Sequence, residues 1–310
     1  MGSVHRLILE EGIQEARRIA AVDKIERLCI DAAYGVLSDE KGSIGIAHAG
    51  FAMAALPHKR TDKTVWERES GPIKLLVESG LDENQQPIGI PSGPQARMIL
   101  LYLQTQAVRT RCREVELGSS MNGWLHAMGI PVGGRTYRAV REQSQRISRC
   151  RLTFFRRTAS TSLVTNGAFV RDAIFPIEGE DGRQLHFWQE RVTLDEGFYK
   201  SLIEHPLPLR EAAIREICSS SLAIDIYVWL AYRLHVLTAP IEITWGTLHR
   251  QFGDSYKEVR KFKRDVIQPL RLALSVYPEA HVNVDLQVGL TLYPSPPPVS
   301  DRNALRRSAL

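Results

Sequence analysis

The stretch that decides the fold is Arg135–Cys150, which reads RTYRAVREQSQRISRC. On a helix, which turns by about 100° per residue, its cations and one glutamine fall within a single arc of roughly 140°. This cationic side comprises Arg135, Arg138, Arg141, Gln145, Arg146 and Arg149. Small or apolar residues occupy the opposite side, at Thr136, Ala139, Val140, Ile147 and Cys150. The sequence therefore predicts a helix with one side in a protein core and one side that exposes guanidinium groups.

The basic run extends past this helix, because eight arginines and a single acid, Glu142, lie between Arg135 and Arg157. A guanidinium is planar, permanently charged and forked, so it matches phosphate oxygens and the edge of guanine. A solvated helix face is the alternative for any run of charges, although such faces normally mix both signs. Taken alone, this helix leaves both interpretations open.

The composition narrows the class of protein. A chain of 310 residues, 44% of them hydrophobic, is long enough for two or three domains with real cores. The net charge is +5, and a locally basic surface suits an acidic polymer as partner. Four scattered cysteines without C-x-x-C spacing give no zinc or redox motif and favour a reducing compartment.

Neither a signal peptide nor a membrane span is predicted. Met1–Leu9 lacks the sustained apolar run of a signal peptide. The most apolar stretch, Leu222–Leu237, is too short and too charged to cross a bilayer and reads as a core helix. We therefore expect a soluble, cytoplasmic protein.

The elements around the arginine helix form a recognisable order. An amphipathic helix over 95–112 comes first, and a short helix follows that Ser119 or Ser120 caps and Gly129 ends. After the arginine helix, β-like runs are predicted over 152–155, 162–165, 169–175 and 185–194, with Asn166–Gly167 as a hairpin turn. Two helices, a basic helix and a hairpin are the order of a winged helix, whose basic helix enters the major groove.

The same order returns in the C-terminal half. A helix over 220–237 precedes a short helix that Thr244 caps and Gly253 ends, and Ser255–Glu258 reads as a capping box for a third helix. The apolar side of that third helix carries Val259, Phe262, Val266, Leu270 and Leu274. Its basic side carries Lys257, Arg260, Lys261, Arg264, Gln268 and Arg271. Pro269 should kink or weaken its last turns, and a strand alternates over 282–292.

These patterns predict an α+β protein with two tandem winged-helix domains and an N-terminal helical extension. The expected boundaries are an arm over 1–42, a first domain with its preceding segment over 43–195, a second domain over 196–300 and a disordered tail over 301–310. A basic helix in the same position of both domains strongly favours DNA binding over a solvated face.

No pattern supports an enzyme. Gly129–Thr136 is close to a phosphate-binding loop, but arginine replaces the lysine and the preceding segment is a helix rather than a strand. The nine histidines are spread singly, and neither HExxH nor GxSxG occurs. We expect no catalytic residues, no metal and no cofactor.

Several motifs together resemble one family, the plasmid-encoded RepA-type replication initiators. The resemblance is carried by GIPSGPQARMILLYLQTQAVRT from Gly89, EVELGSSM from Glu114, GGRTYR from Gly133, REQ from Arg141, RISRC from Arg146, SLAIDIYVWLAYRL from Ser221, Trp245 and PSPPP from Pro294. It covers about residues 43–300 and leaves the first 40 residues outside. Their order and spacing, rather than any single motif, make the resemblance specific.

The resemblance implies more than the residues do. Members of this family use tandem winged helices to bind direct repeats, or iterons, at a plasmid origin as initiators of replication. They promote melting of an AT-rich region and recruit the host initiator and the replicative helicase. Many form homodimers that repress their own promoter and so contribute to plasmid copy control.

We expect each basic helix to lie in a major groove of double-stranded DNA, the two grooves about one helical turn apart. The candidate base readers are Arg138, Arg141, Gln145, Arg260, Arg264 and Gln268. The candidate phosphate contacts are Arg135, Arg149, Arg156, Arg157, Lys257 and Lys261. The main alternative is a winged-helix transcriptional repressor without replication activity; a nicking enzyme and a protein-interaction scaffold are further alternatives.

Overall fold

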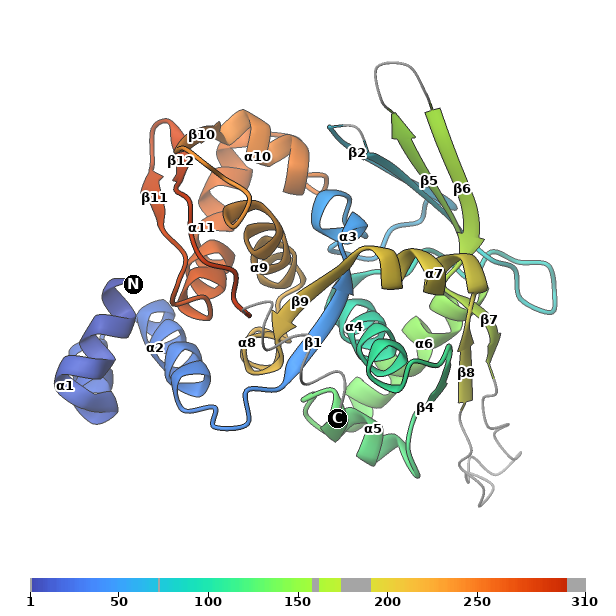
Figure 1. Ribbon diagram of the computed structural model, residues 1–310, viewed down its shortest axis with the longest axis horizontal. Coiled ribbons are helices and arrows are strands. Elements are labelled where there is room, and N and C mark those ends of the chain that lie inside the picture. The colour runs from blue at the N-terminus through green and yellow to red at the C-terminus, as the bar shows by residue number, and fades with distance from the viewer. Residues whose placement is uncertain (1, 72, 158–161, 174–190, 300–310) are drawn as a thin grey trace. The chain divides into compact units, whose positions relative to one another are not determined.

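The computed structural model describes residues 2–71, 73–157, 162–173 and 191–299. It divides into two compact units (Figure 1). Unit 1 combines Met1–Gly45 with Leu207–Leu310, and unit 2 is Ile46–Pro206. The chain passes between them within β1 (Ile44–His48) and at β9 (Pro206–Arg210). In the described ranges, no helix combines the length and the apolar character that a bilayer span requires.

Unit 2 is a mixture of helices and antiparallel sheets. Its helices are α3 (Gly50–Met53), α4 (Gly93–Thr110), α5 (Met121–Ala127), α6 (Gly134–Arg149) and α7 (Glu196–Glu204). One sheet has the order β2 (Val65–Ser70), β3 (Ile73–Glu78), β5 (Arg151–Arg157) and β6 (Ser162–Ala168). The other has the order β4 (Glu114–Glu116), β8 (Arg191–Leu194) and β7 (Val170–Ala173).

Local chemistry explains the two helices that precede α6 and the turn that leads into it. Pro94 stands in the first turn of α4, where its missing N–H costs no hydrogen bond. The hydroxyl of Ser120 accepts a hydrogen bond of 3.1 Å from the N–H of Gly123 and so caps α5. Gly129 then turns the chain with φ of 69°. The helices predicted over 95–112 and 135–150 and the short helix between them are confirmed.

The predicted hairpin turn of unit 2 is wrong. Asn166 and Gly167 lie inside β6, opposite Thr153 and Leu152 of β5. The Thr153 hydroxyl donates a hydrogen bond of 3.0 Å to the Asn166 side-chain oxygen, which fixes this register. The true connection falls between Arg157 and Ser162, outside the described residues, as do His186, Trp188 and Glu190 of the predicted strand over 185–194.

In unit 1, α9, α10 and α11 repeat the order of α4, α5 and α6, and a separate sheet accompanies them. Its helices are α1 (Ser3–Ile19), α2 (Lys24–Leu37), α8 (Glu211–Glu216), α9 (Ser221–Leu234), α10 (Trp245–Phe252) and α11 (Val259–Ser275). Its sheet has the order β10 (Ile241–Thr244), β12 (Gly289–Leu292) and β11 (Val282–Asp285). Thr244 caps α10 as predicted, since its hydroxyl accepts from the N–H of Thr247 at 3.2 Å.

The strand between α4 and α5 of unit 2 pairs differently from the strand between α9 and α10 of unit 1. In unit 1, β10 joins the hairpin of β11 and β12 to form a single three-stranded sheet. In unit 2, the corresponding β4 pairs with β8, whereas the hairpin of β5 and β6 continues from β3. The two units therefore share an order of elements, but their strands pair differently.

Two further predictions for the C-terminal half are wrong. Ser255–Glu258 forms no capping box, because α11 begins at Val259 and Glu258 makes no side-chain cap hydrogen bond. The predicted strand over 282–292 is a hairpin, in which the Asp285 carboxylate accepts from the N–H groups of Gln287 and Val288 and turns the chain. Pro269 lies inside α11, which nonetheless continues to Ser275.

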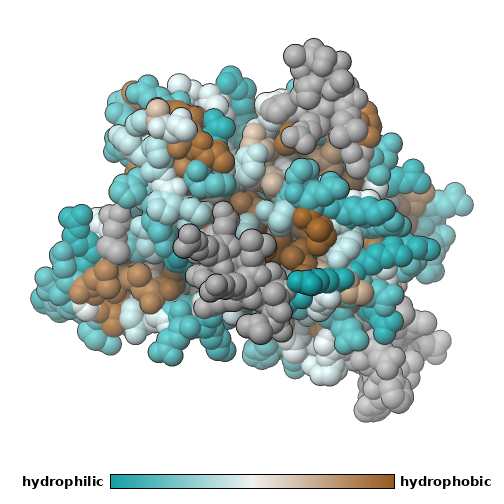
Figure 2. All heavy atoms as spheres, viewed as in Figure 1, coloured by the Kyte–Doolittle hydropathy of each residue, from teal (hydrophilic) through white to brown (hydrophobic). Residues whose placement is uncertain are grey.

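The N-terminal helices, expected as a separate arm, belong to unit 1. His5 makes a buried hydrogen bond of 2.8 Å with the carbonyl oxygen of Ser275, at the end of α11. Asp23 at the start of α2 lies 3.6 Å from the guanidinium of Arg271. Figure 2 shows hydrophobic surface where α1 and α2 lie. Leu9 and Ile19 of α1 are exposed. The expected tail over 301–310 lies outside the described residues.

Candidate nucleic-acid interface

Helix α6 has the two sides that its sequence predicts. Val140, Ile147 and Cys150 are buried in unit 2. Most of the predicted cationic side is exposed, namely Arg135, Arg138, Gln145 and Arg149, and Arg141 is half-buried. The buried residues hold the helix against α4, while the exposed ones present forked donors outward.

Arg146 is the exception, and its assignment to the DNA-facing side is wrong. Its side chain is only 4% exposed. The guanidinium donates to the carbonyl oxygen of Ile90 at 3.1 Å and to the carboxylate of Glu142 at 2.5 Å. Burial lowers the pKa of Arg146 from its usual value, and Glu142 opposes that shift. Arg146 therefore holds α6 to the segment that precedes α4.

The side chains of two predicted phosphate contacts in unit 2, Arg156 and Arg157, lie outside what the structure describes. The backbone of Arg156 and Arg157 lies in β5, opposite Leu163 and Ser162 of β6. Among the predicted contacts of unit 2, those whose side chains are described and exposed are therefore the ones on α6.

Helix α11 also has a buried and an exposed side. Phe262, Val266 and Leu270 are almost fully buried, whereas Val259, which was expected beside them, is 40% exposed at the start of the helix. The exposed side carries Arg260, Lys261, Arg264 and Gln268. These residues were predicted to share one face, and they do.

Two other residues of the predicted basic face lie elsewhere. Lys257 is exposed but precedes the first residue of α11. Arg271 is half-buried and forms an ion pair of 3.6 Å with Asp23 of α2. The ion pair directs this guanidinium toward the N-terminal helices rather than into the row of exposed cations.

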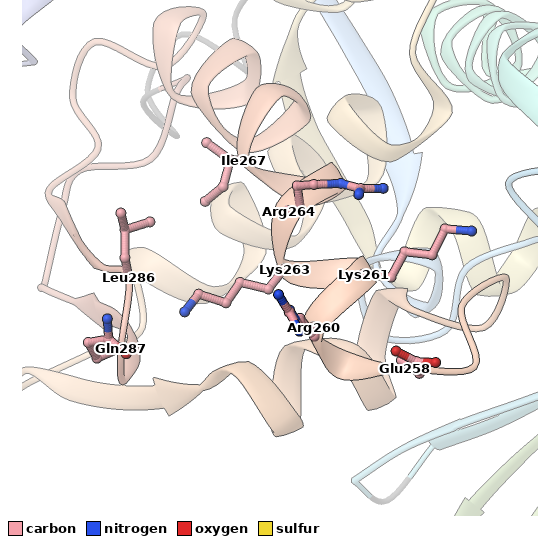
Figure 3. Close-up of a pocket in the computed structure, with 8 residues that line it drawn as sticks. All are labelled: Glu258, Arg260, Lys261, Lys263, Arg264, Ile267, Leu286 and Gln287. Carbon is pink, nitrogen blue, oxygen red and sulfur yellow. The ribbon is translucent and has the colours of Figure 1, made fainter.

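A basic groove lies between α11 and the turn of the β11–β12 hairpin (Figure 3). It is open to solvent and has a volume of about 810 Å³. It is lined by Glu258, Arg260, Lys261, Lys263, Arg264, Ile267, Leu286 and Gln287. Four of these side chains are cations and one is an acid, which makes the groove suitable for an anionic ligand.

Sequence reasoning missed Lys263 and the turn. Lys263 lies at the edge of the basic arc, half-buried, with its ammonium group 5.8 Å from the centre of the Trp245 ring. Leu286 and Gln287 were assigned to a continuous strand. The groove exists only because Asp285 turns the chain there, and the spacing of residues along α11 carries no signal for that.

The charges of the groove are fixed by short contacts. Asp265 accepts a hydrogen bond of 2.8 Å from Arg264 and raises the pKa of that guanidinium. The N–H groups of Val288 and Gln287 lower the pKa of Asp285, and Lys263 adds to this shift. Arg264 therefore stays charged at neutral pH, which is the condition for binding phosphate.

The described residues do not form a candidate metal-binding site. Among the residues that the structure describes, no group of three or more histidine, cysteine, aspartate or glutamate side chains is placed to hold a metal ion. The cationic surfaces of α6 and α11 are thus the features on which a function can be argued.

Comparison with known proteins identifies the family. A sequence profile described as "Plasmid encoded RepA protein" matches residues 90–245, just over half of the chain. The chain belongs to the plasmid-encoded RepA family. The match spans α4 to the start of α10, so it includes α6, whereas the groove of α11 lies beyond it. Membership in the RepA family supports a role in initiating plasmid replication.

The fold has counterparts among solved structures. A crystal structure of domains 2 and 3 of RctB covers 81% of this chain and 99% of its own, with 16% identity and a TM-score of 0.54. A second structure of RctB domains 2–3 covers 75% of this chain and 83% of its own, with 17% identity and a TM-score of 0.47. The first of these shows that the RepA-family chain shares its α+β fold with domains 2 and 3 of RctB. No curated protein sequence matches the chain.

Proposed function

We propose that this protein initiates plasmid replication by binding double-stranded DNA at direct repeats of the origin. One observation carries the proposal: α6 and α11 each bury their apolar side and expose a row of cations on the other. Each helix follows two other helices and precedes a hairpin, so each unit is proposed to act as a winged helix.

In this proposal the exposed residues divide into two roles. Arg138, Arg260 and Arg264 read guanine edges, because a forked guanidinium pairs with two acceptors of that base in the major groove. Gln145 and Gln268 pair with adenine in the same way. Arg135, Arg149, Lys257 and Lys261 contact phosphates, fix the register and make the affinity depend on salt.

The protein is proposed to act by binding alone, without a catalytic step or a cofactor. Opening of an adjacent AT-rich segment would draw on binding energy, which deforms DNA at flexible base steps. The family relationship adds three further proposals: recruitment of the host initiator, recruitment of the replicative helicase, and dimers that repress the protein's own promoter.

A gel shift with a cognate origin repeat tests the proposal. Arg138→Ala and Arg260→Ala are the informative variants, since Arg141 is half-buried and Arg264 is paired with Asp265. Each lost base contact should weaken specific binding by about 1–3 kcal/mol while binding to shuffled DNA changes little. Arg18→Ala, an exposed arginine of α1, is the matched control. Unchanged binding by both variants would remove these helices from the interface.

A promoter-binding repressor is the competing function. It would bind an inverted repeat as a stable dimer and leave plasmid maintenance unaffected. Maintenance of an origin plasmid that receives this protein from a second plasmid separates the two, because only an initiator supports it.

A further inference from the structure

The turn beside the basic groove exposes two aliphatic side chains. Leu286 is 56% exposed and Val288 is 50% exposed, at the tip of the β11–β12 hairpin. Single exposed aliphatic residues are common on protein surfaces. Here, however, two of them flank Gln287, which lines the basic groove, and Lys263 extends from α11 toward this turn (Figure 3).

The turn is built so that these side chains stay outside. The Asp285 carboxylate accepts from the N–H of Gln287 at 2.6 Å and from that of Val288 at 2.9 Å. Trp245 donates its indole N–H to the Asp285 carbonyl at 3.0 Å and its backbone N–H to the Val288 carbonyl at 3.2 Å. Four hydrogen bonds thus fasten a turn of five residues, which leaves its tip rigid and preorganised.

Gly289 tightens the turn further. Its φ is +149°, and a Cβ atom at this position would lie 2.0 Å from the carbonyl oxygen of Ile243 in β10. The hairpin therefore approaches β10 more closely than any side chain would allow. Local rearrangement of the backbone to bury Leu286 or Val288 would break this packing.

The charge around the tip selects the partner. Arg260, Lys261, Lys263 and Arg264 line the groove next to it, and the acid of the tip, Asp285, is engaged by two N–H groups. A protein partner with an apolar pocket would not need four cations beside that pocket. A DNA duplex presents phosphates to the cations and stacked bases to an apolar tip.

We propose that the Asp285–Gly289 turn is a wedge that deforms DNA. While the cations of the groove hold the backbone, Leu286 and Val288 press into the minor groove at a base step and partly unstack it. Apolar wedges of this kind kink duplexes toward the major groove. Pyrimidine–purine steps deform most readily, so the wedge acts best at a TA step. This inference rests on the proposed DNA-binding function and assigns the deformation to a particular element.

The test measures binding and bending separately. A duplex containing one origin repeat carries fluorophores at its ends for the bend angle and 2-aminopurine at the proposed step for unstacking. The double variant Leu286→Gln/Val288→Gln should bind within about threefold of wild type, yet lose most of the bend and the fluorescence rise. The double variant Leu286→Met/Val288→Ile, which keeps the tip apolar, should retain both signals. Val236→Gln, at an exposed valine of unit 1 that does not line the groove, is the control.

The outcomes are distinguishable. If wild-type protein binds the repeat but does not bend it, or if the glutamine variant bends it as wild type does, the wedge is overturned while DNA binding stands. A loss of affinity above about tenfold with the bend unchanged makes the tip an ordinary contact and also overturns the wedge. If wild-type protein does not bind origin DNA at all, the proposed function fails together with the wedge.

Discussion

Arg146 of α6 donates a hydrogen bond of 3.1 Å to the carbonyl oxygen of Ile90, a residue that precedes α4. Three residues earlier on the same helix, the Gln143 side-chain oxygen accepts from the N–H of Ser92 at 2.8 Å. These two contacts hold α6 by one side. Because that side is occupied, Arg135, Arg138 and Arg149 are left to face solvent.

Arg146→Ala should therefore lower stability rather than remove a DNA contact. The substitution leaves the carbonyl of buried Ile90 without its donor and takes from half-buried Glu142 its shortest ion pair, so we expect a loss of about 1–3 kcal/mol in the free energy of unfolding. Urea denaturation measures it. Arg149→Ala, at an exposed position of the same helix, should change stability by no more than about 0.5 kcal/mol. Equal effects of the two substitutions would contradict a structural role for Arg146.

The salt dependence of DNA binding should report the phosphate contacts. Arg135→Ala and Lys261→Ala should each reduce the slope of log K against log salt by about 1, because one fewer counterion is released. Fluorescence anisotropy at several salt concentrations gives the slope. Arg18→Ala should leave it unchanged. A wild-type slope retained by both phosphate variants would place those two side chains away from the backbone.

Gly289→Ala should disrupt the hairpin of unit 1. The new Cβ atom would collide with the Ile243 carbonyl, and the φ of +149° is unfavourable for any residue with a side chain. We expect a loss of roughly 1–3 kcal/mol from the strained backbone, together with weaker DNA binding. Gly71→Ala is the comparison, since Gly71 also has a positive φ but nothing lies within 4 Å of its added Cβ. If Gly289→Ala costs no more than Gly71→Ala, the close approach to β10 does not constrain the hairpin.

Acid should destabilise the protein through His48. Burial lowers the pKa of His48 to about 4, with a smaller contribution from His205. The unfolded chain binds a proton near pH 6.5, whereas the folded chain does not until about pH 4. The stability that neutral His48 contributes to the folded state is therefore fully present above pH 6.5 and is lost as the pH falls toward 4. The total loss in the free energy of unfolding is about 3 kcal/mol.

Urea denaturation at pH 7.5 and at pH 5 tests this. His48→Gln should depend less on pH than wild type across this window, although it loses the hydrogen bonds to Gly50 and Ser201 at both values. His126→Gln, at an exposed histidine of α5, should keep the wild-type dependence. The burial of His5 and His58 also lowers their pKa values, so some dependence remains in His48→Gln. An identical pH dependence of wild type and His48→Gln would contradict the account.

The sequence predicted the helices of both units because their apolar residues recur with helical spacing. Val140 and Ile147 of α6, and Phe262 and Val266 of α11, are buried as that spacing requires. The same spacing could not identify Arg146 as buried. Its partner, Ile90, is 56 residues away in the chain, and periodicity along one helix carries no information about such a contact.

The turns were harder to predict than the helices. Asn166–Gly167 has the composition of a tight turn, but pairing with Thr153 and Leu152 kept it inside β6. The alternation over 282–292 continues unbroken through Leu286 and Val288, which conceals the turn that Asp285 creates. At Asn166–Gly167, pairing with another segment decides the outcome, and local sequence alone does not encode it. At Asp285 the cause of the turn is local, but the unbroken alternation of apolar residues predicts a strand in its place.

The place of the N-terminal helices was also beyond the sequence. Their helical character is visible, but they pack against α11 through contacts such as that of His5 with Ser275, 270 residues apart. Because the sequence does not reveal that contact, it predicts an independent arm over residues 1–42. The contact also explains why Arg271, which shares the spacing of the exposed cations, is paired with Asp23 instead.

Hydroxyl-radical footprinting on the origin of the cognate plasmid tests the central claim most directly. If α6 and α11 read the origin, protection should recur at the fixed spacing of direct repeats, and separate parts of each protected site should be lost in Arg138→Ala and in Arg260→Ala. The absence of any protection, or a protected pattern that neither variant alters, would contradict the claim that α6 and α11 are the DNA-reading helices of this protein.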